Sequence, residues 1–476
     1  MKRSFILFAM LIAFLLFSCS SSHSSNDTDI LPDSDEDTQD SETQDDDSDS
    51  QSSEIVDDYE ETPDESSSVI DRYKRCYDEI PDEPYEGLFA DPNLELQIKM
   101  NLWNKNGLNT DYELQKEDLE YLREVSICTK DLRGIEKLIN LESIAISGGN
   151  VYDFTPLLKL EKLKTVKIDA GDRDCGNPFL GIFKVMPLNI VFENITCLDG
   201  SFSQLTNLEK VLIYNTNLKD ISPVEQLVNL ASLTMNNNEI EFLPKNIGNL
   251  QKLEYLHFSN NNIKDIELVK SLTNLNTLYC NGNKINDISP VTNLVNLIGL
   301  ELNSNLIEEI PKEITSLKKL QKVDLSFNNI GSLPDLKGLD SLVTVRFSNN
   351  ALNDEALIKI GELKNVRYLH LSENSFTKVP VLKNMKSVNI LYISKNKIAD
   401  LTGFADEETF PTLEKLYLDS NKIENVEALR NRKGLTELRI YKNCIKDISP
   451  LEELKASGTY IDGMNEQMES CEGTSE

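Results

Sequence analysis

The chain has 476 residues, 39% of them hydrophobic, and a formal net charge of −32 at pH 7. This length supports a sizeable core, whereas the acidic balance and the lack of a basic stripe argue against a nucleic-acid partner. The whole chain contains only three histidines, which leaves little material for a catalytic or metal-binding constellation.

The first eighteen residues have the pattern of a secretion signal. Two basic residues precede an apolar run over 5–17, which is too short to span a bilayer. The stretch LFSC at 16–19 resembles the cleavage box of bacterial lipoproteins, in which the cysteine becomes the lipidated first residue. We therefore predict a signal peptide over 1–18 and lipidation of Cys19. The alternative is ordinary secretion with an incidental cysteine.

An acidic tether follows over 19–71. Residues 20–71 contain twenty Asp or Glu and no Lys or Arg, so this stretch cannot bury enough apolar surface to offset the loss of chain entropy. We predict a disordered, self-repelling spacer. Alternating aspartates over 27–37 raise the alternative of calcium binding, but the glycine and closing glutamate of a calcium loop do not follow at the expected spacing.

Residues 72–121 contain the predicted N-terminal cap. In the segment FADPNLELQIKMNLWNKNGL, Asp91 can cap a helix and Pro92 suits the first helical position. The apolar residues that share one face of this helix are Leu94, Ile98 and Leu102. A stack of repeats needs such a cover over its first open edge.

One pattern recurs from residue 122 to residue 455, with a period of 22 to 25 residues in its regular part. Taking the first Leu of each unit as position 1, apolar residues recur at positions 1, 4, 6 and 11. This period and pattern are typical of leucine-rich repeats. The fifteen units begin at Leu122, Leu141, Leu163, Val185, Leu208, Leu230, Leu253, Leu275, Leu297, Leu320, Leu342, Val366, Val388, Leu413 and Leu435.

The alternation of apolar positions 4 and 6 with polar positions 3 and 5 predicts a short strand with one buried face. An asparagine at position 9 can bond the turned backbone through both its donor and its acceptor groups. We predict a ladder of such side chains. Its members are Asn238, Asn261, Asn283, Asn305, Asn328, Asn350, Asn374, Asn396, Asn421 and Asn443.

Units such as GNKINDISPVTNL and KNCIKDISPLEEL are similar to the 22-residue, internalin-like class of bacterial leucine-rich repeat proteins. The predicted cap also resembles the helical cap of that family, so the resemblance covers about residues 88–455. It implies an α/β solenoid of about fifteen coils, shaped as a horseshoe with short parallel strands on the concave face. It says little about the ligand, because this architecture serves many partners.

Seven cysteines remain after Cys19, and their repeat positions suggest disulfides. Cys175 and Cys197 both fall at position 13 of adjacent predicted coils, roughly 5 Å apart, which is close enough for a bridge. Cys280 occupies a buried position 6 and is expected to be a core thiol. Each end of the solenoid has a further candidate pair, whose geometry the spacing does not decide: Cys444 with Cys471, and Cys76 with Cys128.

No catalytic constellation is visible, so we predict neither an enzyme nor a cofactor or metal. His257 and His370 both occupy position 5, in coils five units apart, and on the order of 24 Å should separate them. They cannot form a dyad or share a metal. The sequence contains no phosphate-binding glycine loop, zinc spacing or nucleophile elbow either.

The concave face is the candidate binding surface, because positions 3 and 5 point away from the core. Aromatic and arginine residues, the types enriched at binding hot spots, collect there. Tyrosine also suits strands for its own sake, which explains part of the enrichment. We expect the rings of Tyr368, Tyr392 and Tyr417 to form a contiguous patch at the energetic centre. The candidate residues are Tyr255, His257, Tyr279, Arg346, Tyr368, His370, Tyr392, Tyr417, Arg439 and Tyr441.

Two functional hypotheses remain. The first is a surface-anchored lipoprotein of the bacterial cell envelope, on the outer membrane or cell surface, whose repeats over 122–455 bind a protein or peptide. The second is a structural envelope or coat protein without a dedicated soluble ligand. In both, residues 456–476 form a C-terminal cap or tail, and the lipid anchor is the sole predicted contact with the membrane.

Overall fold

The computed structural model describes residues 88–89, 92–106, 114–129, 131–147, 151, 153–169 and 197–471. All of them belong to one compact unit, Asp64–Glu476. The predicted signal peptide, Cys19 and the acidic tether lie outside the described residues, so these assignments remain predictions. Within the described ranges, no helix is both long and apolar enough to cross a membrane.

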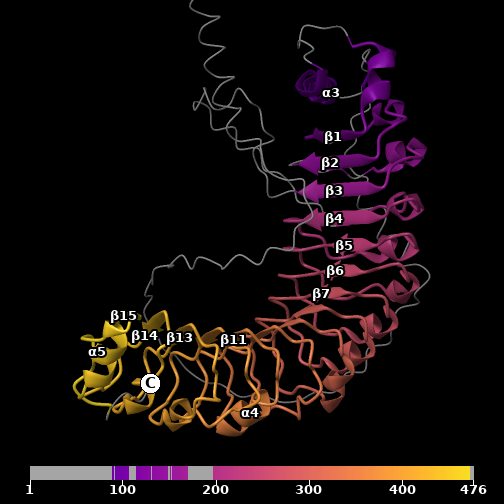
Figure 1. Ribbon diagram of the computed structural model, residues 1–476. Helices are drawn as coiled ribbons and strands as arrows, with labels where there is room; N and C mark the ends of the chain where they lie inside the picture. The colour runs from indigo at the N-terminus through magenta and orange to yellow at the C-terminus, as the bar shows by residue number, and fades with distance from the viewer. Residues whose placement is uncertain are drawn as a thin grey trace, which may run out of the picture. The chain divides into compact units, whose positions relative to one another are not determined.

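Fifteen short strands form one parallel sheet, in which each strand pairs with the next along the chain (Figure 1). The predicted leucine-rich repeat solenoid is therefore confirmed. Within this unit the strands lie on the inner side of a curved stack, which we call the concave face (Figure 1). The strands are β1 (Glu124–Ile127), β2 (Ser143–Ser147), β3 (Thr165–Asp169), β4 (Lys210–Tyr214), β5 (Ser232–Thr234), β6 (Tyr255–His257), β7 (Thr277–Tyr279), β8 (Gly299–Glu301), β9 (Lys322–Asp324), β10 (Thr344–Arg346), β11 (Tyr368–His370), β12 (Ile390–Tyr392), β13 (Lys415–Tyr417), β14 (Glu437–Arg439) and β15 (Tyr460–Asp462).

Short helices return the chain on the outer side of the stack (Figure 1). The α-helices are α3 (Pro92–Asn106), α4 (Asp354–Ile360) and α5 (Ser449–Ala456). The 3-10 helices are η1 (Lys116–Tyr121), η2 (Ile135–Lys137), η3 (Thr155–Lys159), η4 (Phe202–Gln204), η5 (Ser222–Gln226), η6 (Ile247–Asn249), η7 (Glu267–Ser271), η8 (Ser289–Asn293), η9 (Lys312–Ser316), η10 (Thr402–Ala405) and η11 (Glu427–Leu429).

The strand register aligns equivalent repeat positions. Leu256 at position 4 pairs with Leu278, and His257 at position 5 pairs with Tyr279. Because successive side chains of a strand point to opposite faces, positions 4 and 6 enter the core while positions 3 and 5 lie on the concave face. Leu256 and the position-6 residue Phe258 are fully buried. The apolar positions thus form one continuous core through the stack.

The predicted asparagine ladder is present and satisfies backbone groups of two coils at once. The Nδ2 of Asn305 donates to the carbonyl oxygens of Cys280 in the preceding coil, at 2.9 Å, and of Leu302 in its own coil, at 3.0 Å. Its Oδ1 accepts from the backbone N–H of Ile285 at 3.0 Å. The preceding residue, Ser304, has a positive φ of 56°, as the tight turn requires. The ladder therefore ties each turn to the coil before it.

A second polar ladder, which we did not predict, runs along the residue just before position 1. Its asparagines donate from Nδ2 to a backbone carbonyl of the preceding coil, for example from Asn274 to Gln251 at 2.7 Å. Ser341 and Thr412 donate from their hydroxyls in the same way. The recurrent Asn-Leu dipeptide was the sequence signal for it. The asparagines concerned are Asn140, Asn207, Asn229, Asn274, Asn296 and Asn365.

The unit predicted to begin at Val185 does not add a strand to the sheet. β3 and β4 are hydrogen-bonded neighbours, so no strand stands between them. The unit had Glu193 at position 9, where the regular coils have the ladder asparagine. The sheet still has fifteen strands because β15 forms beyond the last predicted unit, within the segment expected to be a cap or tail.

Because the Val185 unit adds no strand, Cys197 has a different repeat position from the one that the predicted disulfide assumed. The backbone of Cys197 forms an isolated parallel β-bridge with that of Asp220, which is position 13 of the coil beginning at Leu208. It therefore takes position 13 of the coil that contains β3, the place that periodicity assigned to Cys175. Cys197 is disulfide-bonded. Because Cys175 lies outside the described residues, its pairing with Cys197 stays a prediction.

Helix α3 covers the first edge of the sheet, as the cap pattern predicted. It begins at Pro92, and its three predicted apolar residues are buried. Two of its amides bond the open edge of β1. The Nε2 of Gln97 donates to the carbonyl of Cys128 at 2.7 Å, and the Nδ2 of Asn101 donates to that of Ser126 at 3.1 Å. The edge is thus blocked against pairing with another strand.

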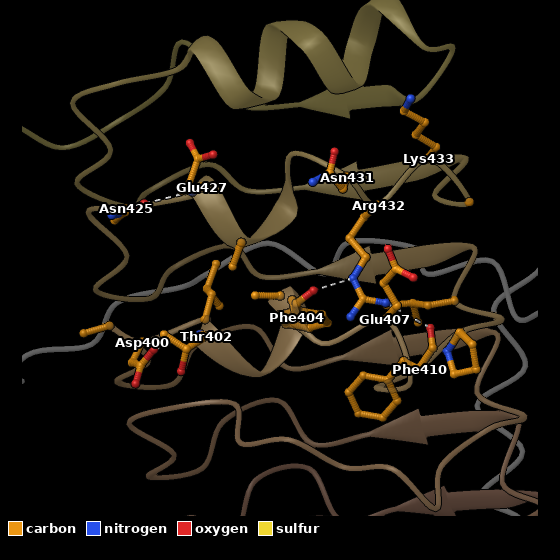
Figure 2. A pocket seen from close by; sticks show the side chains of 17 residues that line it. Asp400, Thr402, Phe404, Glu407, Phe410, Asn425, Glu427, Asn431, Arg432 and Lys433 are labelled. Carbon is orange, nitrogen blue, oxygen red and sulfur yellow. Dashed lines mark hydrogen bonds between the residues drawn. The ribbon is translucent and has the colours of Figure 1, made fainter.

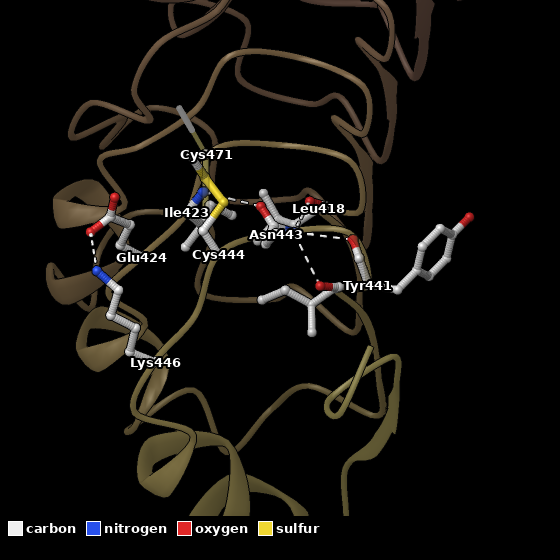
Figure 3. The surroundings of a disulfide bond; sticks show 9 residues. Leu418, Ile423, Glu424, Tyr441, Asn443, Cys444, Lys446 and Cys471 are labelled. Atoms are coloured by element: carbon white, nitrogen blue, oxygen red, sulfur yellow. Dashed lines mark hydrogen bonds and ion pairs between the residues drawn. A yellow bond between two sulfur atoms is a disulfide. The ribbon is translucent and has the colours of Figure 1, made fainter. Parts of the chain in front are cut away.

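The C-terminal end closes with β15 and with Gln467, which takes over from the last ladder asparagine. The Nε2 of Gln467 donates to Ile440 and Gly463, the two position-6 carbonyls of the last coils. Cys444 and Cys471 form the disulfide expected at this end, with their Cα atoms 5.7 Å apart. Figure 3 shows this bridge beside ladder residue Asn443.

Of the two remaining described cysteines, one is disulfide-bonded and the other is a free thiol. Cys128 is disulfide-bonded, and its predicted partner Cys76 lies outside the described residues, so this pairing stays a prediction. Cys280 is a free thiol with 1% exposure, and burial raises its pKa to about 12. A thiol in this environment is inert toward oxidation and alkylation.

Candidate binding face

The candidate residues of the concave face separate into two clusters rather than one patch. The first, which we call the ring triad, consists of Tyr255 and His257 on β6 and Tyr279 on β7. Their three rings lie with centroids 5.5–6.1 Å apart and with interplanar angles of 77–90°. All three side chains are half-buried. The rings thus meet nearly at right angles to one another, with no stacked pair among them.

Polar groups orient the imidazole of the ring triad. Its Nδ1 lies 3.1 Å from the amide nitrogen of Asn236, which can only donate, so Nδ1 is the acceptor. Its Nε2 then donates to the hydroxyl of Ser259 at 2.9 Å. Burial lowers the pKa of His257, although the nearby carboxylate of Glu301 acts in the opposite direction. The ring is therefore neutral at pH 7.

Glu301 lies at the edge of the ring triad, paired with Tyr279 across β7 and β8. Burial and then its negative charge raise the pKa of Tyr255, and they raise that of Tyr279 to about 12. The carboxylate accepts from Nδ2 of Asn281 at 3.1 Å and forms an ion pair with Lys322 at 2.7 Å. The local field at the three rings is thus set by one partly compensated negative charge.

Gly299 allows Tyr279 to lean across β8. A Cβ atom at this position would lie 3.3 Å from the phenol oxygen and 3.4 Å from Cε1 of the ring, closer than side chains normally pack. The absence of a side chain at position 3 therefore leaves the space that the tyrosine ring occupies.

The second cluster is a position-5 stack that runs through four consecutive strands. His370 stacks on Tyr392 with centroids 4.3 Å apart, and Tyr392 stacks on Tyr417 at 4.4 Å, with interplanar angles of 17° and 4°. The guanidinium of Arg439 lies 5.2 Å from the centroid of Tyr417. The register of β11 to β14 places these side chains opposite one another.

Charged pairs continue the position-5 stack at both ends. Arg346 precedes His370 and lies 3.9 Å from Asp324, while Arg439 lies 3.4 Å from Asp462 on β15. Each arginine therefore has an aspartate on its outer side. The ring faces within the stack largely cover one another.

Tyr417 is the most buried ring of the position-5 stack, with 8% exposure. Its phenol donates to Oε1 of Glu437 at 2.9 Å, and Lys415 lies 3.0 Å from the other oxygen of that carboxylate. Burial, and then the bond to Glu437, raise the pKa of Tyr417. Tyr417 therefore packs beneath the surface of the concave face and offers little area to a partner.

We expected Tyr368, Tyr392 and Tyr417 to form one contiguous patch, and this prediction was wrong for Tyr368. Tyr368 occupies position 3, where its strand neighbours are Thr344 and Ile390, and it makes none of the ring contacts found for Tyr392 and Tyr417 in the described chain. His370 takes its place. Alternation along β11 separates position 3 from position 5.

Tyr441 also stands apart from the position-5 stack. It occupies position 7, and its ring points away from Asn443 and the disulfide (Figure 3). The two histidines of the folded part lie on β6 and β11, five strands apart, as the periodicity predicted. Within the described residues, no group of three or more His, Cys, Asp or Glu is placed to hold a metal ion.

A pocket of about 770 Å³ lies behind the sheet, between the coils that contain β12 and β13. Arg432 enters it and donates to the carbonyls of Phe404 and Thr409 at 2.7 Å and to that of Asp406 at 2.9 Å (Figure 2). Its guanidinium also lies 5.5 Å from the Phe404 centroid. These bonds anchor the chain over 404–410 to Arg432. The charged side chain in the pocket therefore has a structural role.

The imidazole of His370 should remain neutral in mildly acidic solution. Burial, and then the charge of Arg346, lower its pKa from 6.5 to about 4. Between these values the unfolded chain binds a proton that the folded chain does not, so stability should fall as the pH drops from 6.5 to 4. An NMR titration would measure the pKa, and a His370→Gln variant should show a flatter dependence of the urea midpoint in this window. Protonation of His370 near pH 6.5 would contradict the predicted burial.

Part of the chain is similar in sequence to known leucine-rich repeat proteins. The protein family described as "Leucine Rich repeats (2 copies)" matches residues 251–293, which include β6 and β7. The chain has the leucine-rich repeat fold. Over 151 residues, 30% of its length, this chain is 31% identical to the human "Leucine-rich repeats and immunoglobulin-like domains protein 3". That match spans 13% of the human protein.

Solved structures of several leucine-rich repeat proteins share the fold. An internalin (inlF) from Listeria monocytogenes is 24% identical, with 79% of this chain and 95% of that chain covered and a TM-score of 0.57. A leucine-rich repeat protein of Leptospira interrogans is 23% identical, with 73% and 97% covered and a TM-score of 0.56. The Arabidopsis receptor kinase HAESA, solved with the peptide hormone IDA and the co-receptor SERK1, is 19% identical, with 68% and 53% covered and a TM-score of 0.52.

Proposed function

We propose that this leucine-rich repeat protein binds a protein or peptide partner through its concave face. The observation that carries the proposal is the concentration of planar aromatic and arginine side chains on that face, in the ring triad and the position-5 stack. Such residues dominate the energetics of protein interfaces. A rigid stack of coils presents them without the entropy cost of ordering loops.

The HAESA complex supports this class of function, because a protein of the same fold is solved there with a peptide hormone. We further propose that Cys19 carries a lipid anchor and that the repeats stand on the extracytoplasmic side of a bacterial envelope. The disulfide between Cys444 and Cys471 supports an oxidising compartment. Binding without catalysis fits both the repeat architecture and the separation of the two histidines.

The alternative is a structural envelope or coat protein without a dedicated ligand. Native crosslinking on intact cells, followed by identification of the linked peptides, separates the two. Crosslinks from the concave face to one discrete partner support binding. Ladders of linked copies, or links to envelope scaffold proteins, support the structural alternative.

A triple variant with Tyr255→Ala, Tyr392→Ala and Arg439→Ala should lose partner binding. Truncation of a hot-spot residue typically costs about 2 kcal/mol, or roughly thirty-fold in affinity. A matched control replaces exposed lysines away from the concave face, with Lys245→Ala, Lys312→Ala and Lys446→Ala. Circular dichroism should first show that both variants are folded. Retained binding in the concave variant together with loss in the control would place the site on the outer side.

A further inference from the structure

The ring triad and the position-5 stack differ in how their rings are arranged. In the stack, neighbouring rings are nearly parallel and 4.3–4.4 Å apart, so they cover one another's faces. In the triad, the planes meet at 77–90° with centroids 5.5–6.1 Å apart. No ring of the triad is covered by a parallel neighbour within it. Unlike the stack, the triad thus has no ring face covered by a parallel ring, and the face is the electron-rich part of an aromatic side chain.

The charged groups that lie in register with the rings also differ between the two clusters. Arg439 lies over the last ring of the stack, and Arg346 precedes its first, so the stack is already supplied with cations. The triad has the carboxylate of Glu301 beside it, and that side chain retains 14% exposure. Its imidazole is neutral and engaged with Asn236 and Ser259. A positive group approaching the triad thus meets ring faces and a carboxylate without a cation inside the cluster.

We propose that Tyr255, His257, Tyr279 and Glu301 form a subsite for a cationic side chain, a lysine ammonium or an arginine guanidinium, on the protein partner. This inference rests on the proposed binding function of the concave face. A cation near a tyrosine ring is attracted by the ring quadrupole, and the carboxylate adds a Coulomb term. An anionic group would be repelled by Glu301, and an apolar group would gain from neither interaction.

Lys322 provides an internal competitor for this subsite. It lies 2.7 Å from Glu301 and comes from β9, on the side of the carboxylate away from the triad. Its side chain is 38% exposed, so an incoming cation can share the carboxylate with it or displace it. Removal of Glu301 and removal of Lys322 should therefore change cation binding in opposite directions. A subsite that recognised only shape would not respond in this way.

The test uses small probes, because the partner is unidentified. N-acetyl-lysine amide and N-acetyl-arginine amide are titrated into the folded full chain at low salt, with N-acetyl-norleucine amide as the uncharged comparison. Side-chain NMR signals of Tyr255 and Tyr279, assigned with Tyr→Phe variants, report binding. We expect saturable shifts with both cationic probes and an affinity at least about three-fold above that of the norleucine probe.

Three variants complete the test. Glu301→Gln should weaken the cationic probes about three-fold or more and leave the norleucine probe unchanged, whereas Lys322→Gln should strengthen the cationic probes. Glu309→Gln, which removes the same charge from an exposed site of the same coil, should have no effect. Equal affinity for the charged and uncharged probes, or an unaltered response in Glu301→Gln, would overturn the cation subsite. The triple variant tests the wider function separately: lost partner binding there, with failed probe titrations, would retain the binding face and reject only this subsite.

Discussion

Asn421→Ala should lower the free energy of unfolding by about 2–4 kcal/mol. The side chain is 2% exposed, and its Nδ2 donates to the carbonyls of Ile393, Leu418 and Asp419 at 3.0–3.3 Å. Its Oδ1 accepts from the backbone N–H of Ile398 at 3.0 Å. Alanine would leave the backbone N–H of Ile398 buried without its acceptor, which costs about 1–3 kcal/mol. The three carbonyls would each lose one bond but keep another donor, namely Nδ2 of Asn396, Nδ2 of Asn443 and the backbone N–H of Lys395.

The measurement is urea unfolding followed by circular dichroism. The control is Asn431→Ala, an exposed asparagine of the same coil, which should change the free energy of unfolding by less than about 0.5 kcal/mol. Because each coil contacts mainly its neighbours, hydrogen exchange in the Asn421 variant should increase first around β12 to β14. Equal losses in the two variants would show that the ladder does not carry the stability of the turn.

Arg432→Met should destabilise the C-terminal coils by about 2–4 kcal/mol. The methionine retains the apolar stem but not the charged donors. Three backbone carbonyls, those of Phe404, Asp406 and Thr409, would lose bonds of 2.7–2.9 Å. Bonds from a charged donor are worth more than neutral ones, and two of the three carbonyls belong to buried residues, Phe404 and Thr409.

Arg430→Met is the matched control, two residues earlier in the same coil. Arg430 forms exposed ion pairs with Glu427 and Glu453, which solvent screens, so its loss should be clearly smaller. Thermal unfolding and limited proteolysis over 402–411 would compare the two. A larger effect of the exposed arginine would mean that the segment is held by surface charge instead of by buried carbonyl bonds.

The repeat pattern predicted the core and the ladder because both depend on local periodicity. Leu416 at position 4 and Leu418 at position 6 are fully buried, and Asn421 at position 9 bonds the turn as expected. Each requirement recurs in every coil, so one register predicts many contacts. The second asparagine ladder had the same kind of signal in the Asn-Leu dipeptide and could have been predicted.

The contacts within the candidate site could be predicted only in part. Periodicity places Tyr392 and Tyr417 side by side, but whether rings stack or meet at right angles depends on side-chain torsions and on neighbours such as Gly299. The structural role of Arg432 was also hidden, because the local sequence NRKG is typical of an exposed basic turn. Its carbonyl partners lie 22 or more residues away along the chain.

By itself, the sequence determined the solenoid, the helical cap, the apolar core positions and the face on which aromatic residues collect, because these follow from a period repeated along the chain. Only the tertiary structure decided that the Val185 unit adds no strand and that β15 does, because a strand joins the sheet only where it can pair with a neighbour. It also divided the aromatic face into an acid-flanked triad and an arginine-flanked stack, because charge and ring orientation depend on residues in adjacent coils.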